Sequence, residues 1–204
     1  MTRCMSFARH HAHASSTVFT AIHEEEQNVN IDDLQASDHD ILRSKAASAF
    51  TDGKTSTEYR RDNRFFLLLQ AHGLGTPTER LDHLSEVYKG SLRAALSLKA
   101  GSLQLFARLK SLGKKVIVVT EGPQDAQEWT VQELGLQPSI DILITTNKIG
   151  KSKIDGLFPA VLEEYDIAAS DMVYVGDNEK RDSQLEDSTA FCVNSLTKLE
   201  HLIE

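Results

Sequence analysis

The sequence predicts an α/β protein with a Rossmann-like, three-layer α/β/α parallel sheet and an α-helical subdomain. Three observations predict it. The first half of the chain shows apolar residues at helical spacing and no strand pattern. After residue 115, short β-branched runs alternate with helical segments of about 10–15 residues, which is typical of βαβ units. Polar residues follow three of these runs, where a parallel sheet gathers its ligand-binding groups.

The composition is that of an ordinary globular domain. The chain has 204 residues, of which 40% are hydrophobic and 25% charged, so it can bury a substantial core. Its apolar runs are strand-sized and far short of the roughly 20 residues that a membrane span needs. The formal net charge of −8 argues against a nucleic-acid partner but leaves room for a phosphorylated substrate.

The cysteines and the N-terminal segment indicate a cytoplasmic protein. Cys4 and Cys192 lie far apart and fit no zinc spacing, so a reducing compartment is the simplest interpretation. The segment 1–7 has no apolar core of the kind that a signal peptide carries. We therefore expect no secretion.

The first half of the chain predicts helices separated by polar connections. The expected helices cover residues 8–26, 40–50, 57–72 and 78–97, with a polar stretch at 28–40. In the last of them, apolar residues recur every three or four positions. These residues are Leu81, Leu84, Val87, Tyr88, Leu92 and Leu96.

The second half predicts the sheet and its helices. A short helix around Leu105 is expected to end at Gly113, in a left-handed C-cap. Strands are expected at 116–119, 140–145, 172–175 and 190–193. Helices are expected at 124–135, 154–165, 179–187 and 196–203.

Three of the strands lead into residues that suit phosphoryl transfer. The first is followed by Thr120, Glu121 and Gly122, the second by Lys151 and Lys153, and the third by Asp177 and Asp182. A hydroxyl and a lysine bind phosphate oxygens and offset their charge, and paired carboxylates supply the hard oxygen ligands that Mg²⁺ prefers. The sequence therefore predicts a phosphate and magnesium site at one edge of the sheet.

The order of these motifs resembles that of the haloacid dehalogenase-like (HAD-like) hydrolase superfamily. The family's second motif, an apolar strand ending in Ser or Thr, is matched by residues 116–120. Its third, a lysine shortly before a helix, is matched within residues 150–158. Its fourth, an apolar strand followed by Gly-Asp and a second acid, is matched by residues 173–177 and Asp182. The resemblance covers roughly residues 98–195.

The resemblance implies a Mg²⁺-dependent phosphatase of small phosphorylated metabolites. Thr120 and Lys153 would be catalytic, and Glu121, Gly122 and Lys151 would help to bind the substrate. Asp177 and Asp182 would hold the metal. Lys153 is preferred to Lys151 because it lies nearer to the expected helix, although the choice stays open. The expected partner is a small phosphorylated substrate or phosphate, with no nucleic acid and no membrane; the sequence does not predict whether the protein is a monomer or a homodimer.

The resemblance also implies a division of the chain. Residues 1–26 would be the helix that follows a missing first strand, residues 27–97 a helical cap, and residues 98–204 the Rossmann-like core.

The sequence departs from the family at the first motif. The family carries Asp-x-Asp after an apolar strand, where the first Asp attacks phosphorus and the second acts as general acid and base. In this chain Asp32-Asp33 and Asp38-His39-Asp40 are the nearest matches, and neither follows an apolar strand. We therefore expect the 204 residues to be impaired or inactive, either as part of a longer gene product or through loss of the nucleophile.

Other interpretations remain. A non-catalytic protein could keep the same residues for phosphate sensing or partner binding, and dehalogenation is a further activity of the family. A receiver domain is disfavoured, because no acidic pair follows the first strand. His10, His11 and His13 are interpreted as structural residues of a polar helix face, since no acid or second ligand cluster lies near them.

Overall fold

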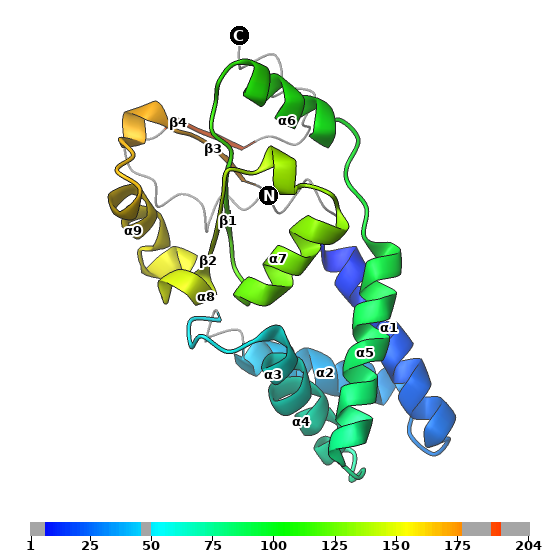
Figure 1. Ribbon diagram of the computed structural model, residues 1–204. Coiled ribbons are helices and arrows are strands. Elements are labelled where there is room, and N and C mark those ends of the chain that lie inside the picture. The colour runs from blue at the N-terminus through cyan, green and yellow to red at the C-terminus, as the bar shows by residue number, and fades with distance from the viewer. Residues whose placement is uncertain (1–6, 46–49, 177–188, 193–204) are drawn as a thin grey trace. The chain divides into compact units, whose positions relative to one another are not determined.

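The computed structural model of the protein describes residues 7–45, 50–176 and 189–192 (Figure 1). These residues divide into two compact units. The helical unit comprises residues 7–45 and 54–96, and the α/β unit comprises residues 50–53, 97–176 and 189–192. Within these residues no helix is both long and apolar enough to cross a membrane.

The helical unit is built from amphipathic helices. Its elements are α1 (Phe7–Glu25), α2 (Ile31–Lys45), α3 (Ser56–Arg60), the π-helical turn η2 (Arg61–Phe65), α4 (Phe66–Ala71) and α5 (Thr78–Ala95). Helices α1 and α5 lie side by side (Figure 1). Their buried positions include Val18 and Ile22 on α1 and Leu84 and Leu92 on α5, spaced four and eight residues apart as one helix face requires. The helices expected at 8–26 and 78–97 are thus confirmed.

Two helical predictions in this unit need correction. The segment expected as a polar stretch at 28–40 is helical from Ile31, and the helix expected at 40–50 is the end of α2. Asn30 explains the early start, because its side-chain oxygen accepts a hydrogen bond from the backbone N–H of Asp32 at 2.7 Å. The helix expected at 57–72 exists, but the π turn η2 interrupts it.

The α/β unit alternates strands and helices. Its elements are α6 (Ser102–Ser111), β1 (Ile117–Thr120), α7 (Gln124–Glu133), η3 (Gln137–Ser139), β2 (Ile142–Thr145), α8 (Thr146–Ile149), η4 (Lys153–Asp155), α9 (Leu157–Glu164), η5 (Ala169–Asp171), β3 (Val173–Gly176) and β4 (Thr189–Cys192). The four expected strands are confirmed to within about two residues at each end. Gly113 adopts φ +65°, which confirms the left-handed C-cap after α6.

Helices lie on both sides of the β1–β2 pair. Figure 1 shows α7 on one side of these strands and α9 on the other. Leu157 and Val161 of α9 pack with Ile144 of β2 in one buried apolar cluster. The parallel sheet and the α/β/α layering predicted from the sequence are therefore confirmed.

The strands form two parallel ladders. β1 pairs with β2, and β3 pairs with β4. Among the described residues no ladder joins the two pairs. The helices expected at 179–187 and 196–203 lie outside the described residues.

Candidate functional site

The carboxyl ends of β1 and β2 coincide. Thr120 and Thr145 are register partners at the last rung of the parallel ladder. Thr120 is half-buried, and its hydroxyl lies 3.4 Å from the carbonyl oxygen of Glu121. Helix α7 starts after Pro123 without a side-chain cap, so Thr120 does not serve as its N-cap. The predicted phosphate ligand therefore lies at the expected strand end without a capping role that would account for it.

Hydrogen bonds join the loops that follow β1 and β2. The Gly122 N–H donates to the Thr146 hydroxyl at 3.2 Å, and the Thr145 hydroxyl donates to the side-chain oxygen of Gln124 at 2.6 Å. The Gln124 N–H in turn points to the side-chain oxygen of Asn147 at 3.4 Å. These supporting residues were missed in the sequence. The signal for them was the polar run Thr145-Thr146-Asn147 directly after an apolar strand.

Gly122 holds a backbone conformation that favours glycine. Its φ is +140°, and a Cβ atom there would lie 2.8 Å from Nε2 of Gln127. Because its N–H is already bonded to Thr146, that amide is not directed at a ligand in this conformation. Gly122 therefore shapes the turn after β1, and its predicted contact with the substrate stays a prediction.

The structure separates the two candidate lysines. Lys153 is only 6% exposed, whereas Lys151 is exposed. Nζ of Lys153 lies 3.4 Å from the hydroxyl of Tyr174 on β3 and 5.8 Å from the ring centroid of Phe158 on α9. The rings of Phe158 and Tyr174 meet edge to face at 4.9 Å. Lys153 thus reaches from the loop after β2 to the strand that precedes Asp177, a contact that no local sequence signal marks.

The predicted metal ligands follow β3. This strand ends at Gly176, so Asp177 is the first residue beyond its carboxyl end in the chain. Asp177 and Asp182 both lie outside the described residues. Among the residues that the structure describes, no three His, Cys, Asp or Glu side chains gather as a metal site would require. The metal and phosphate roles of these residues stay predictions.

The Asp-x-Asp sequence at Asp38 belongs to a helix. Asp38 and Asp40 lie in α2, and Asp38 is buried at 4% exposure. Both of its carboxylate oxygens accept hydrogen bonds from Arg64, at 2.7 and 2.8 Å. This aspartate is therefore part of the helical unit's interior and is not placed at a strand end.

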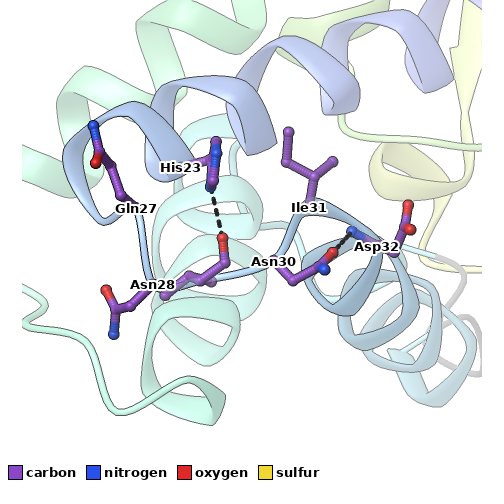
Figure 2. Close-up of a pocket in the computed structure, with 7 residues that line it drawn as sticks. His23, Gln27, Asn28, Asn30, Ile31 and Asp32 are labelled. Atoms are coloured by element: carbon purple, nitrogen blue, oxygen red, sulfur yellow. Dashed lines mark hydrogen bonds between the residues drawn. The ribbon is translucent and has the colours of Figure 1, made fainter.

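The hollow at the turn between α1 and α2 is lined by groups that stabilise the turn itself (Figure 2). Nδ1 of His23 donates to the carbonyl oxygen of Val29 at 2.8 Å, and Asn30 caps α2. The polar groups of this hollow thus close the turn that it borders.

A comparison with models of protein families identifies the family of this chain. The model of the haloacid dehalogenase-like hydrolases matches residues 9–184. The chain belongs to this family. The match includes the helical unit as well as the strand ends with Thr120, Lys153 and Asp177. No curated protein matches the sequence.

Solved structures of HAD hydrolases share the fold. The magnesium-bound structure of YfnB from Bacillus subtilis, described as a HAD hydrolase, is 19% identical with a TM-score of 0.67, covering 98% of this chain and 93% of its own. A 2-haloacid dehalogenase from Pseudomonas syringae pv. Tomato is 15% identical with a TM-score of 0.66, covering 100% and 94%. A HAD phosphatase from Thermococcus onnurineus is 15% identical with a TM-score of 0.64, covering 100% and 94%. At these identities the likeness carries the fold alone.

Proposed function

We propose that this HAD-like hydrolase is built as a Mg²⁺-dependent phosphatase of small phosphorylated metabolites. The observation that carries the proposal is the position of Lys153. It is buried in the α/β unit, and its ammonium lies beside Tyr174 on the strand that leads to Asp177. An ammonium at this position can donate to a phosphate oxygen and offset its charge.

The other residues of the site fit the same chemistry. The Thr120 hydroxyl, at the end of β1, would donate to a phosphate oxygen, and Lys153 would offset the charge of the group. Asp177 and Asp182 are hard oxygen donors of the kind that Mg²⁺ prefers, and they would hold the ion. The bound ion would supply Lewis-acid stabilisation of charge on the phosphoryl oxygens. The hydroxyl and the lysine would orient that group for attack.

The residues that fit this chemistry do not include a group that would attack phosphorus. The 204 residues contain no Asp-x-Asp that follows an apolar strand, and Asp38 is bound to Arg64 in the helical unit. In the part of the chain that the structure describes, the β1–β2 and β3–β4 ladders stay separate. We therefore propose that these 204 residues by themselves bind phosphate but hydrolyse phosphate esters slowly or not at all.

A chimera tests this proposal. The first strand and Asp-x-Asp motif of a HAD phosphatase would be fused ahead of Met1, and hydrolysis of a panel of small phosphate esters would be measured with Mg²⁺ and with EDTA. We expect Mg²⁺-dependent hydrolysis by the chimera and near-background rates for the 204-residue chain. A chimera with the motif's first Asp changed to Asn is the matched control, and it should be inactive.

Two other results would redirect the assignment. A folded chimera that binds phosphate without hydrolysing any ester would favour a non-catalytic phosphate-binding protein. Release of chloride from a 2-chloroalkanoate, without phosphatase activity, would favour dehalogenation.

A further inference from the structure

The segment from Thr120 to Gln124 is joined to the end of β2 at alternate residues. Thr120 is the register partner of Thr145 on the last rung of the ladder. Gly122 donates its N–H to the Thr146 hydroxyl at 3.2 Å. The side-chain oxygen of Gln124 accepts from the Thr145 hydroxyl at 2.6 Å. The turn after β1 is therefore held to β2 at its beginning, its middle and its end.

Both threonines at the end of β2 are completely buried. Thr145 and Thr146 are each 0% exposed, although each carries a hydroxyl. They follow the apolar residues 142–144, and at such buried positions a valine would bring no polar atom that loses its water. Buried polar groups that are fully satisfied rigidify a structure and specify one arrangement of the groups that they join. The two hydroxyls therefore fit a role in setting geometry better than a role in packing.

The two hydroxyls have different second roles. That of Thr145 also accepts from the Lys148 N–H at 3.0 Å and thereby caps helix α8. A change at position 145 would thus disturb this helix together with the turn. The Thr146 hydroxyl accepts from Gly122 in the loop after the other strand. Thr146 is therefore the residue whose hydroxyl can be removed with the least effect on α8.

Gly122 is the residue of the turn that most needs such a bond. It is buried, and its φ of +140° lies in a region that glycine enters readily. Glycine has the largest backbone freedom of any residue, so the bond to Thr146 restricts it more than it would restrict another residue. A buried N–H without a partner costs free energy, which favours the conformation in which Thr146 accepts it. The direction in which the chain leaves Thr120 is set by the same conformation.

The two joined loops carry residues of the proposed phosphate site. Thr120 precedes the turn after β1, and Lys153 lies in the loop that follows β2. Groups that are already in place before a ligand arrives lose less freedom when it binds. The affinity for phosphate therefore depends on the residues that hold this turn as well as on those that would touch the ligand.

We propose that Thr146 is a positioning residue of the phosphate site. Its hydroxyl holds the Gly122 N–H, and this bond sets the turn through which Thr120 presents its own hydroxyl to a phosphate oxygen. The bond between Thr145 and Gln124 supports the same turn from its far end. The inference rests on the proposed phosphate-binding function, and it assigns to Thr146 no contact with phosphate.

Substitutions at position 146 test the proposal through phosphate affinity. T146V keeps the branched shape of the side chain but removes the acceptor of the Gly122 N–H, and T146S restores that acceptor. Isothermal titration calorimetry of the full chain with inorganic phosphate and Mg²⁺ measures the affinity. We expect T146V to bind phosphate about tenfold more weakly than the wild type, because the turn loses its central bond. T146S should bind within about twofold of the wild type.

Thr130 provides the matched control. It is also buried, at 3% exposure in the α/β unit, but its hydroxyl donates to the Ala126 carbonyl oxygen of its own helix at 2.8 Å. T130V thus removes a buried hydroxyl that joins no loops, and it should leave phosphate affinity within about twofold. Urea unfolding gives the stability of each variant. A merely structural role for Thr146 predicts that T146V and T130V both lose stability while both keep wild-type affinity, and this result would contradict the proposal.

The Gly122 amide reports on the turn without any ligand. Selective ¹⁵N-glycine labelling shows its NMR signal, which is assigned by its absence in G122A. We expect its hydrogen exchange to be about tenfold faster in T146V than in the wild type and close to the wild-type rate in T146S. An unchanged exchange rate in a folded T146V would overturn the proposal, because the bond to Thr146 would then not hold the turn.

The outcomes separate this inference from the function on which it rests. Wild-type phosphate affinity in a folded T146V overturns the positioning role and leaves the phosphate site standing, whereas absence of phosphate binding by the wild type overturns both. If T146V does not fold, Q124M takes its place, since Gln124 is half-buried and its side chain accepts from Thr145. Q124M should weaken phosphate binding by about threefold or more, and wild-type affinity in Q124M would overturn the proposal.

Discussion

Arg64 binds Asp38 with two hydrogen bonds of 2.7 and 2.8 Å, and both side chains are buried. The pair joins η2 to α2 across 26 residues of sequence. Removing one member of such a pair leaves an uncompensated charge in the interior, which typically costs about 3–5 kcal/mol. The pair therefore fixes the interior of the helical unit.

We expect D38A to lower the free energy of unfolding by about 3 kcal/mol or more, because Arg64 loses its carboxylate. D40A is the matched control, since Asp40 is two residues away with an 82% exposed side chain. Urea unfolding followed by circular dichroism measures both. A D38A protein as stable as D40A would show that the pair contributes little.

We expect the stability of the protein to depend on His11 under acidic conditions. Its pKa is about 4 in the folded chain and 6.5 as the reference value, so the unfolded chain binds a proton first as the pH falls. The His11 contribution is therefore complete above about pH 6.5 and is lost between about pH 6.5 and pH 4, by up to about 3 kcal/mol.

The test compares the pH dependence of unfolding in H11Q and H13Q. Glutamine at position 11 can still accept from Tyr88 but does not titrate, so the loss of stability between pH 6.5 and pH 4 should be smaller in H11Q. His13 is exposed and serves as the control. Identical profiles for the wild type and H11Q would argue against a depressed pKa at this position.

We expect a substitution of Gly122 to destabilise the turn after β1. Its φ of +140° is readily adopted by glycine, whereas any other residue would be strained there by about 1–3 kcal/mol. A new Cβ atom would also crowd the side chain of Gln127. G90A is a control of opposite sign. Gly90 lies within α5 with open space around it, so alanine there should stabilise by about 0.5–1 kcal/mol. Thermal unfolding of both variants checks the prediction, which fails if G122A is as stable as the wild type.

We expect the two candidate lysines to differ in phosphate binding. K153M should weaken Mg²⁺-dependent phosphate binding at least tenfold, because it removes the buried ammonium beside Tyr174. K151M should change it less than twofold, since Lys151 is exposed. Isothermal titration calorimetry with inorganic phosphate, with and without Mg²⁺, measures both. The reverse order would assign the phosphate contact to Lys151.

Local sequence patterns predicted most of the fold. Helix-period spacing located α1 and α5, and β-branched runs located β1 and β2, because burial of one face or of a whole strand leaves a direct trace in the sequence. The start of α2 was missed although Asn30 is a good N-cap, since the polar residues after it outweighed that signal. Local spacing does not mark a π turn, and η2 was missed for this reason.

The supporting contacts of the candidate site were less predictable. Lys153 and Tyr174 lie 21 residues apart, and Arg64 and Asp38 lie 26 apart, so each pairing is created by tertiary packing. The sequence singled out Lys153 by its place before a helix but gave no sign that it would be buried. His10 was interpreted as a structural residue of a polar helix face, and the sequence did not show that it is only 8% exposed, because the burial of a terminal helix depends on what packs against it.

The central proposal is that these 204 residues bind phosphate but do not supply the group that attacks phosphorus. The most direct test measures Mg²⁺-dependent phosphate binding and ester hydrolysis on the same preparation of the chain. We predict saturable phosphate binding that K153M weakens at least tenfold, together with hydrolysis at the background rate. Hydrolysis at the rate of an ordinary HAD phosphatase, or no phosphate binding that depends on Lys153, would contradict the account.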